Sequence, residues 1–89
     1  MGIEETKPGD VICYAYSPYG DWLSILVIAK KGQTLTYYDP FLDRDVDAEW
    51  RANAFYGLVD EKTISDPDKG LIQARAKIQG LELRFKTVQ

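Results

Sequence analysis

The apolar residues in the first half of the chain recur with the two-residue period of β-strands. Three predicted strands are separated by turns rich in Gly, Pro, Ser and Asp, and they span residues 11–16, 22–30 and 34–39. Thr and Tyr favour a strand in the third run, and Pro40 ends it. The pattern therefore predicts three consecutive strands joined by tight turns.

The second of these strands is apolar on both faces. Its side chains form two sets, Leu23, Ile25, Val27 and Ala29 on one face and Leu26 and Ile28 on the other. An open hairpin would leave one of these sets in water. We therefore expect the strand to be covered on both sides, as in a small closed barrel or a sheet that carries a helix.

The spacing of apolar residues changes in the middle of the chain. Residues 46–54 contain good helix formers, and Asp47 can cap them, so a short helix is expected there. Residues 55–60 then read as a short strand interrupted by Gly57.

Two interpretations compete for the carboxy-terminal quarter. Ile72, Ala74, Ala76 and Ile78 alternate with polar residues, which would suit a hairpin that turns at Gln79-Gly80. Against this, Asp66 precedes Pro67 as a helix N-cap would, and Gly80 before Leu81 matches a helix C-cap. The capping signals favour a helix over residues 66–79, followed by a closing strand over residues 81–88.

These elements predict an α+β fold that is mainly β. It is a small curled sheet or barrel of about five strands with a C-terminal helix and a closing strand, in one domain over residues 1–89. A chain of this length buries roughly 60–65% of its unfolded surface, enough for one small core. The longest apolar run, residues 23–29, is far too short to span a membrane, and the single Cys13 suits a reducing compartment. A soluble, cytoplasmic protein is expected.

Charge is unevenly distributed along the chain. Residues 39–68 contain nine acids and three bases, a net charge of −6, whereas the remainder has a net charge of +3. The pI of about 4.8 argues against direct binding to nucleic-acid phosphates. Electrostatic attraction of a protein partner with a basic surface is the better expectation.

The residue inventory is poor for catalysis and for metals. The chain has no histidine, and Cys13 lies inside a predicted strand with no base to activate it. Asp43-Arg44-Asp45-Val46-Asp47 resembles the opening of a calcium loop, but Ala48 and Ala54 stand where the loop needs Gly and a bidentate Glu. We therefore expect a non-enzymatic protein with no cofactor and no metal site.

A family resemblance is carried by the aromatic-rich strands. Gly9-Asp10 opens the first strand, Tyr16-Ser17 ends it, Gly20 lies in the turn, Trp22-Leu23 and Val27 follow, and Tyr38-Asp39-Pro40-Phe41 ends the third strand. This pattern, over residues 9–46, resembles the first three strands of a Tudor-type small β-barrel. The resemblance implies a curled five-stranded sheet with an aromatic cage for methylated lysine or arginine, and Tyr16, Tyr38 and Phe41 match its cage positions.

The expected binding surface combines aromatic and acidic side chains. Tyr16, Tyr38 and Phe41 are expected to form one partly exposed cluster with Tyr19 and Trp22 near its rim, although core packing is also a natural role for Trp22. The acidic contribution comes from Asp39, Asp43, Asp45, Asp47 and Glu49. The sequence thus favours a protein-binding function. The alternative is an acidic inhibitor, such as a phage anti-defence or immunity-type protein, whose carboxylates imitate nucleic acid and block a basic groove. An exposed edge of the closing strand could also pair two copies.

Overall fold

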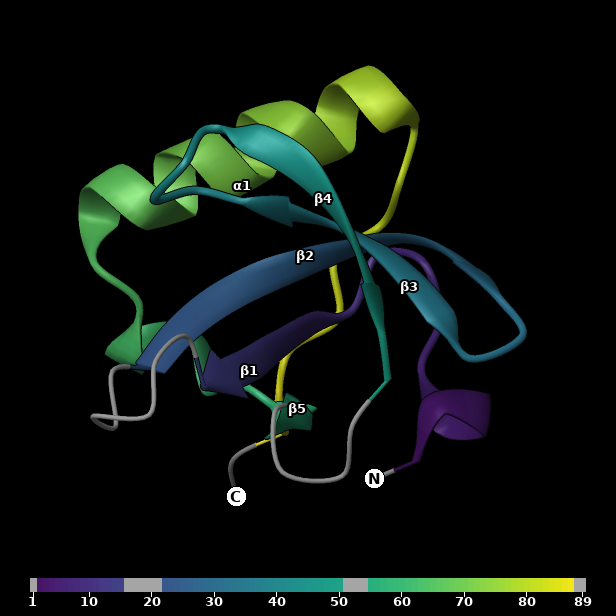
Figure 1. Ribbon diagram of the computed structural model, residues 1–89. Coiled ribbons are helices and arrows are strands. Elements are labelled where there is room, and N and C mark those ends of the chain that lie inside the picture. The colour runs from purple at the N-terminus through teal and green to yellow at the C-terminus, as the bar shows by residue number, and fades with distance from the viewer. Residues whose placement is uncertain (1, 16–21, 51–54, 88–89) are drawn as a thin grey trace.

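The computed structural model describes residues 2–15, 22–50 and 55–87 and confirms a mainly β fold. One open, five-stranded antiparallel sheet has the order β4-β3-β2-β1-β5, and one helix follows it in the chain (Figure 1). The strands are β1 (Val11–Ala15), β2 (Trp22–Lys31), β3 (Thr34–Asp39), β4 (Arg44–Glu49) and β5 (Phe55–Leu58), and the helix is α1 (Asp66–Gln79). Two short 3₁₀-helices are η1 (Ile3–Glu5) and η2 (Glu61–Thr63).

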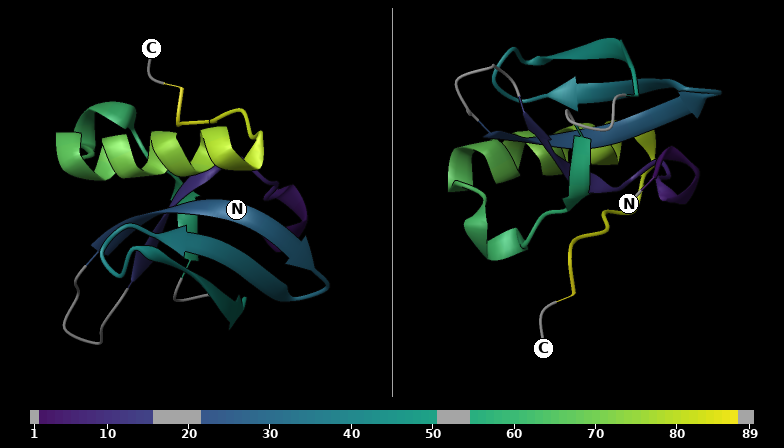
Figure 2. Two further views of the ribbon diagram at one scale, coloured as in Figure 1. Left: turned by 90° about the horizontal axis from the view of Figure 1, so that it is seen from above. Right: turned by 60° about the horizontal axis from the view of Figure 1, so that its bottom comes forward.

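The sheet is covered on both faces, as the apolar alternation of β2 predicts. On one face, α1 packs across the sheet (Figure 2) and buries Val11, Leu26, Tyr38, Val59, Ile64, Ile72 and Ala76. The opposite face buries Ile12, Ile25, Val27, Leu35, Tyr37 and Phe55. Neighbouring residues of β1 and β2 therefore belong to two different apolar layers.

Curling of the sheet covers the second layer. The ring of Trp50, directly after β4, stacks on Phe55, the first residue of β5, with centroids 5.0 Å apart and planes 13° apart. Tyr14 and Tyr37 also contact Phe55, at centroid distances of 4.8 and 5.8 Å. Because β4 and β5 are the two edge strands, this aromatic contact brings the end of β4 close to the start of β5 and leaves the rest of the sheet open.

The prediction of a helix at residues 46–54 is wrong. Residues 44–49 form β4, which pairs with β3 without a bulge from Asp39↔Arg44 to Thr34↔Glu49. Asp43, with φ of 53°, occupies the left-handed region in the turn that reverses the chain between the two strands. Val46 and Ala48 then pack on the second apolar layer, and the intervening acids face outward. Cross-strand pairing thus outweighs helix propensity; residues 51–54 lie outside the described part.

The helix predicted at residues 66–79 is confirmed. Its N-cap is Ser65, one residue before the expected Asp66, and the Ser65 side chain accepts a hydrogen bond from the Asp68 amide at 3.4 Å. Gly80 ends the helix in the left-handed conformation, with φ of 67°, and the Leu81 amide donates to the Ala76 carbonyl at 2.8 Å. No helix in the described residues is long and apolar enough to cross a membrane.

The closing strand predicted at residues 81–88 is wrong for the residues described. Residues 81–87 pass beside the start of β1 and make only one parallel bridge, Asp10↔Arg84. The reason is that β1 already pairs with β2 on one side and β5 on the other, so only its first residues remain available. Arg84 Nε and Nη2 donate to the two carboxylate oxygens of the fully buried Asp10, each at 2.7 Å. This double contact holds residues 81–87 against the start of β1.

Candidate binding site

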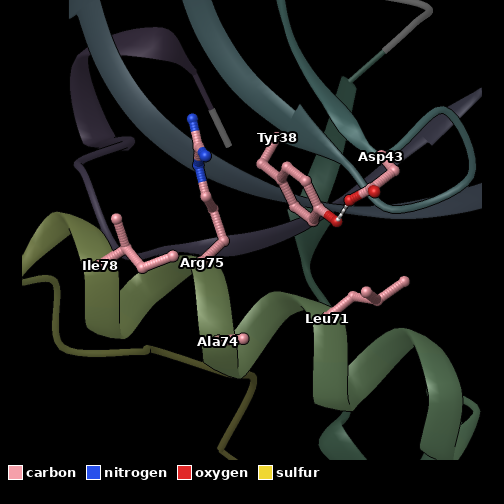
Figure 3. Close-up of a pocket in the computed structure, with 6 residues that line it drawn as sticks. All are labelled: Tyr38, Asp43, Leu71, Ala74, Arg75 and Ile78. Carbon is pink, nitrogen blue, oxygen red and sulfur yellow. Dashed lines mark hydrogen bonds between the residues drawn. The ribbon is translucent and has the colours of Figure 1, made fainter.

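A small pocket lies between α1 and the β3–β4 hairpin. Its volume is about 140 Å³, and Figure 3 shows that its lining comes from both elements. The hairpin contributes Tyr38 and Asp43, and α1 contributes Leu71, Ala74, Arg75 and Ile78. We call this feature the helix–hairpin pocket.

Tyr38 forms the inner wall of the helix–hairpin pocket. Its side chain points from β3 toward α1 and is only 3% exposed, and its hydroxyl donates to Asp43 Oδ1 at 2.5 Å (Figure 3). Burial, followed by the hydrogen bond to Asp43 and its negative charge, raises the pKa of Tyr38 to about 12. The phenol is therefore neutral at physiological pH and acts as a hydrogen-bond donor.

Arg75 ties the helix to the hairpin. Its Nη2 donates to Asp45 Oδ2 at 2.5 Å, and its guanidinium lies 5.8 Å from the centre of the Tyr38 ring. Its Nε is buried without a hydrogen-bond partner among the described residues. The partly exposed guanidinium thus already occupies the cationic position above the Tyr38 ring.

Three carboxylates lie along the outer face of β4. Asp45, Asp47 and Glu49 are all exposed and alternate with Val46 and Ala48, so the strand period places them on one side. We call these three residues the acidic row. Asp47 accepts a hydrogen bond from Thr36 Oγ1 at 2.6 Å, which orients one carboxylate of the row.

Exposed apolar side chains lie on α1 at the helix–hairpin pocket and in the turn between β3 and β4. Ile78 is 75% exposed and Leu71 is 39% exposed, and both lie on α1 beside Arg75. Phe41, in the turn between β3 and β4, is 69% exposed. We call Leu71 and Ile78, which line the pocket, the apolar rim. An apolar surface next to carboxylates suits a partner that is both cationic and amphipathic.

The structure brings part of the predicted surface together. Tyr38, Asp43 and Asp45 lie around the helix–hairpin pocket, and Asp47 and Glu49 extend it along β4. The prediction that Tyr38 is partly exposed is wrong, because its ring packs beneath α1. Tyr16 and Tyr19, the other predicted aromatic contacts of the first hairpin, lie outside the described residues.

Asp39 and Trp22 have roles other than those expected. Asp39 is buried, and its Oδ1 accepts hydrogen bonds from the amides of Phe41 and Leu42, at 2.8 and 3.3 Å, so it shapes the turn. Trp22 is 56% exposed and contacts Tyr56 edge-to-face at 4.6 Å. Since Tyr56 lies on β5, this aromatic pair belongs to the edge of the sheet opposite β4.

Sequence reasoning missed the contribution of α1. Ile72 and Ala76 form the buried face of the helix, whereas Leu71, Arg75 and Ile78 form a neighbouring stripe with helical spacing. Leu71 and Ile78 were a usable signal, because they are apolar positions beyond the buried face of a short helix.

The described residues contain no other chemistry that changes this picture. They include no cluster of three or more His, Cys, Asp or Glu side chains with the geometry of a metal site. Burial raises the pKa of the half-buried Cys13 thiol, which disfavours the reactive thiolate. Comparisons with protein-family models, curated proteins and solved structures gave no match to this chain.

Proposed function

We propose that this protein is a non-enzymatic binding domain that engages a basic segment of a partner protein. The observation that carries the proposal is the acidic row on β4, in which Asp47 and Glu49 are exposed and Asp45 is paired with Arg75, beside the apolar rim of the helix–hairpin pocket. Exposed carboxylates attract a cationic partner and fix its orientation, and apolar contacts then slow its release.

The apolar contacts in this proposal come from Leu71 and Ile78. Recognition of a methylated residue by Tyr16, Tyr38 and Phe41 is a less favourable assignment, because the Tyr38 ring is buried and Arg75 already lies over it. The proposed occupant is therefore a segment that combines Lys or Arg with apolar side chains. Its methylation is not required.

An acidic inhibitor that imitates nucleic acid is the second candidate. Its support is the regular spacing of the acidic row, since alternate residues of a strand are about 6.7 Å apart and their charges form a linear array. The two candidates differ in the partner. A nucleic-acid-binding target would release its DNA or RNA when this protein binds, whereas an ordinary protein partner would not.

The proposal is tested by charge reversal on β4. Asp47→Lys with Glu49→Lys removes two carboxylates of the acidic row and leaves the Arg75–Asp45 ion pair in place. Binding of a lysine-rich amphipathic peptide should weaken about tenfold or more, mainly through slower association and with a smaller dependence on salt. Surface plasmon resonance at several salt concentrations measures both effects.

The matched control is Glu4→Lys with Glu5→Lys. Both residues are exposed in η1, and the pair changes the net charge by the same amount at a different place. Equal weakening by the two double variants would show that only the net charge acts. Unchanged binding by the β4 variant would reject the proposed site.

A further inference from the structure

We infer that the partner's basic segment binds as an added antiparallel β-strand along the outer edge of β4, an inference that rests on the proposed function. In the part of the chain that the structure describes, β4 has one hydrogen-bonded neighbour, β3. Figure 2 shows β4 at the outside of the sheet. An open strand edge presents a row of N–H and C=O groups that a further strand can pair with.

The register identifies which backbone groups face outward. The Trp50 amide donates to the Gln33 carbonyl at 2.6 Å, and the unbroken pairing of β3 with β4 continues from this bond. In an antiparallel ladder, hydrogen-bonded and non-hydrogen-bonded pairs alternate. Arg44, Val46 and Ala48 therefore bond to β3. The N–H and C=O groups of the acidic row, Asp45, Asp47 and Glu49, point to the open edge.

The same residues that offer backbone hydrogen bonds also carry the negative charges. A partner residue paired with one of them would place its side chain on the same face, about 4.5–5.5 Å away between Cβ atoms. Lys or Arg at alternate partner positions would thus meet the acidic row. The positions between them would lie on the face away from α1, beside Val46 and Ala48, which favours apolar or β-branched residues there. Contacts with the apolar rim, on the α1 face, would come from partner residues that flank the added strand. The predicted partner motif alternates basic and apolar residues.

A second copy of this chain is a poor occupant of the edge. Antiparallel pairing of two β4 strands would bring the acidic rows of both copies next to each other, and like charges across a strand pair are destabilising. Charged side chains on an edge strand are a common protection against such self-pairing. The charge pattern therefore selects a basic segment over a copy of itself.

Peptide probes separate strand addition from simple charge attraction. The first probe is the seven-residue peptide Val-Lys-Val-Lys-Val-Lys-Val, and the second has the same composition with its three lysines in one block. Titration calorimetry with the full chain should show about tenfold tighter binding of the alternating peptide, because only its charges match the strand period.

N-methylation of the central Lys amide of the alternating peptide, which faces β4, should weaken binding about tenfold. N-methylation of a neighbouring Val amide, which faces away, is the control and should have a small effect.

A protein variant checks the same contact from the other side. Glu49→Pro removes an outward N–H and no bond to β3, and Glu49→Gln removes the charge alone. The proline variant should bind the alternating peptide several-fold more weakly than the glutamine variant, with thermal melts confirming that both are folded.

The outcomes distinguish the two proposals. Equal binding of the alternating and blocked peptides, with no effect of the methylation site, would overturn strand addition and leave the acidic site standing. Absence of binding by every peptide would count against the proposed function as well. If the free protein dimerises and Glu49→Pro abolishes the dimer, the β4 edge is occupied by a second copy and the inference is overturned.

Discussion

Tyr38 shows how one residue can satisfy a structural and a surface requirement. Its ring fills the layer between the sheet and α1, and its hydroxyl reaches Asp43 at the surface. A buried phenol needs such a partner, because an unsatisfied hydroxyl in an apolar layer costs free energy. The hydrogen bond holds the turn that begins β4, so Tyr38 supports the candidate site from beneath it.

The raised pKa of Tyr38 makes an alkaline test possible. The free side chain has a pKa of 10.0 and the folded protein holds it at about 12, so the folded state retains the proton more firmly. The stabilisation is complete below pH 10 and is lost as pH rises from 10 to about 12. Tyr38→Phe should show a smaller fall in the free energy of unfolding over this window, measured by urea denaturation.

Ultraviolet titration gives the control for this prediction. Asp43→Asn removes the charge and keeps the side chain's size, so the pKa of Tyr38 should fall toward its ordinary value while the ring stays buried. An Asp43→Asn protein whose tyrosines titrate as in the parent would contradict the assigned role of Asp43.

At the scale of elements, local signals predicted some structures and not others. The strands before Pro40 follow from alternation and turns, and α1 follows from its caps, because all of these signals lie within a few neighbouring residues. The strand at residues 44–49 does not follow from local signals, because Ala48 and Glu49 favour a helix. Its structure is decided by hydrogen-bonded pairing with the edge of β3. The prediction of a strand at residues 81–88 fails for a related reason, because the pairing positions of β1 are already taken by β2 and β5.

The approach of segment 81–87 to β1 depends on a glycine. Gly9 has φ of 100°, and a Cβ on it would lie 2.2 Å from the Glu82 carbonyl oxygen, far inside contact distance. Gly32, in the turn between β2 and β3, has φ of 59° and open space around it. Gly9→Ala should therefore cost about 3 kcal/mol or more of unfolding free energy, and Gly32→Ala about 1 kcal/mol. Chemical denaturation of both variants measures the difference; equal costs would show that the segment moves aside freely.

At the scale of the whole molecule, the candidate site joins segments that are distant in the chain. The acidic half of the site was visible in the sequence as a run of carboxylates, but its apolar rim was not, because Leu71 and Ile78 approach Asp43 only when α1 crosses the sheet. The fold also separates the predicted aromatics, burying Tyr38 under the helix and placing Trp22 with Tyr56 at the β5 edge. Composition could suggest a binding surface, but only packing could define it.

The Asp10–Arg84 contact bears on the order in which the chain folds. Consecutive strands β1 to β4 pair with their neighbours, so their loops are short, whereas Asp10 and Arg84 are 74 residues apart. Closing so long a loop costs entropy that the earlier hairpins do not incur, which places this contact late in folding. Arg84→Met should speed unfolding and leave the folding rate nearly unchanged in stopped-flow experiments.

Ile25→Val, in the central strand β2, supplies the comparison. Ile25 is fully buried, and its pairing with Ile12 belongs to the first hairpin, so this change should slow folding. An Arg84 variant that folds as slowly as the Ile25 variant would place the ion pair in the folding nucleus instead. With the expected result, the hairpins set how fast the protein reaches its fold, and a contact between its two distant ends sets how long each molecule stays folded.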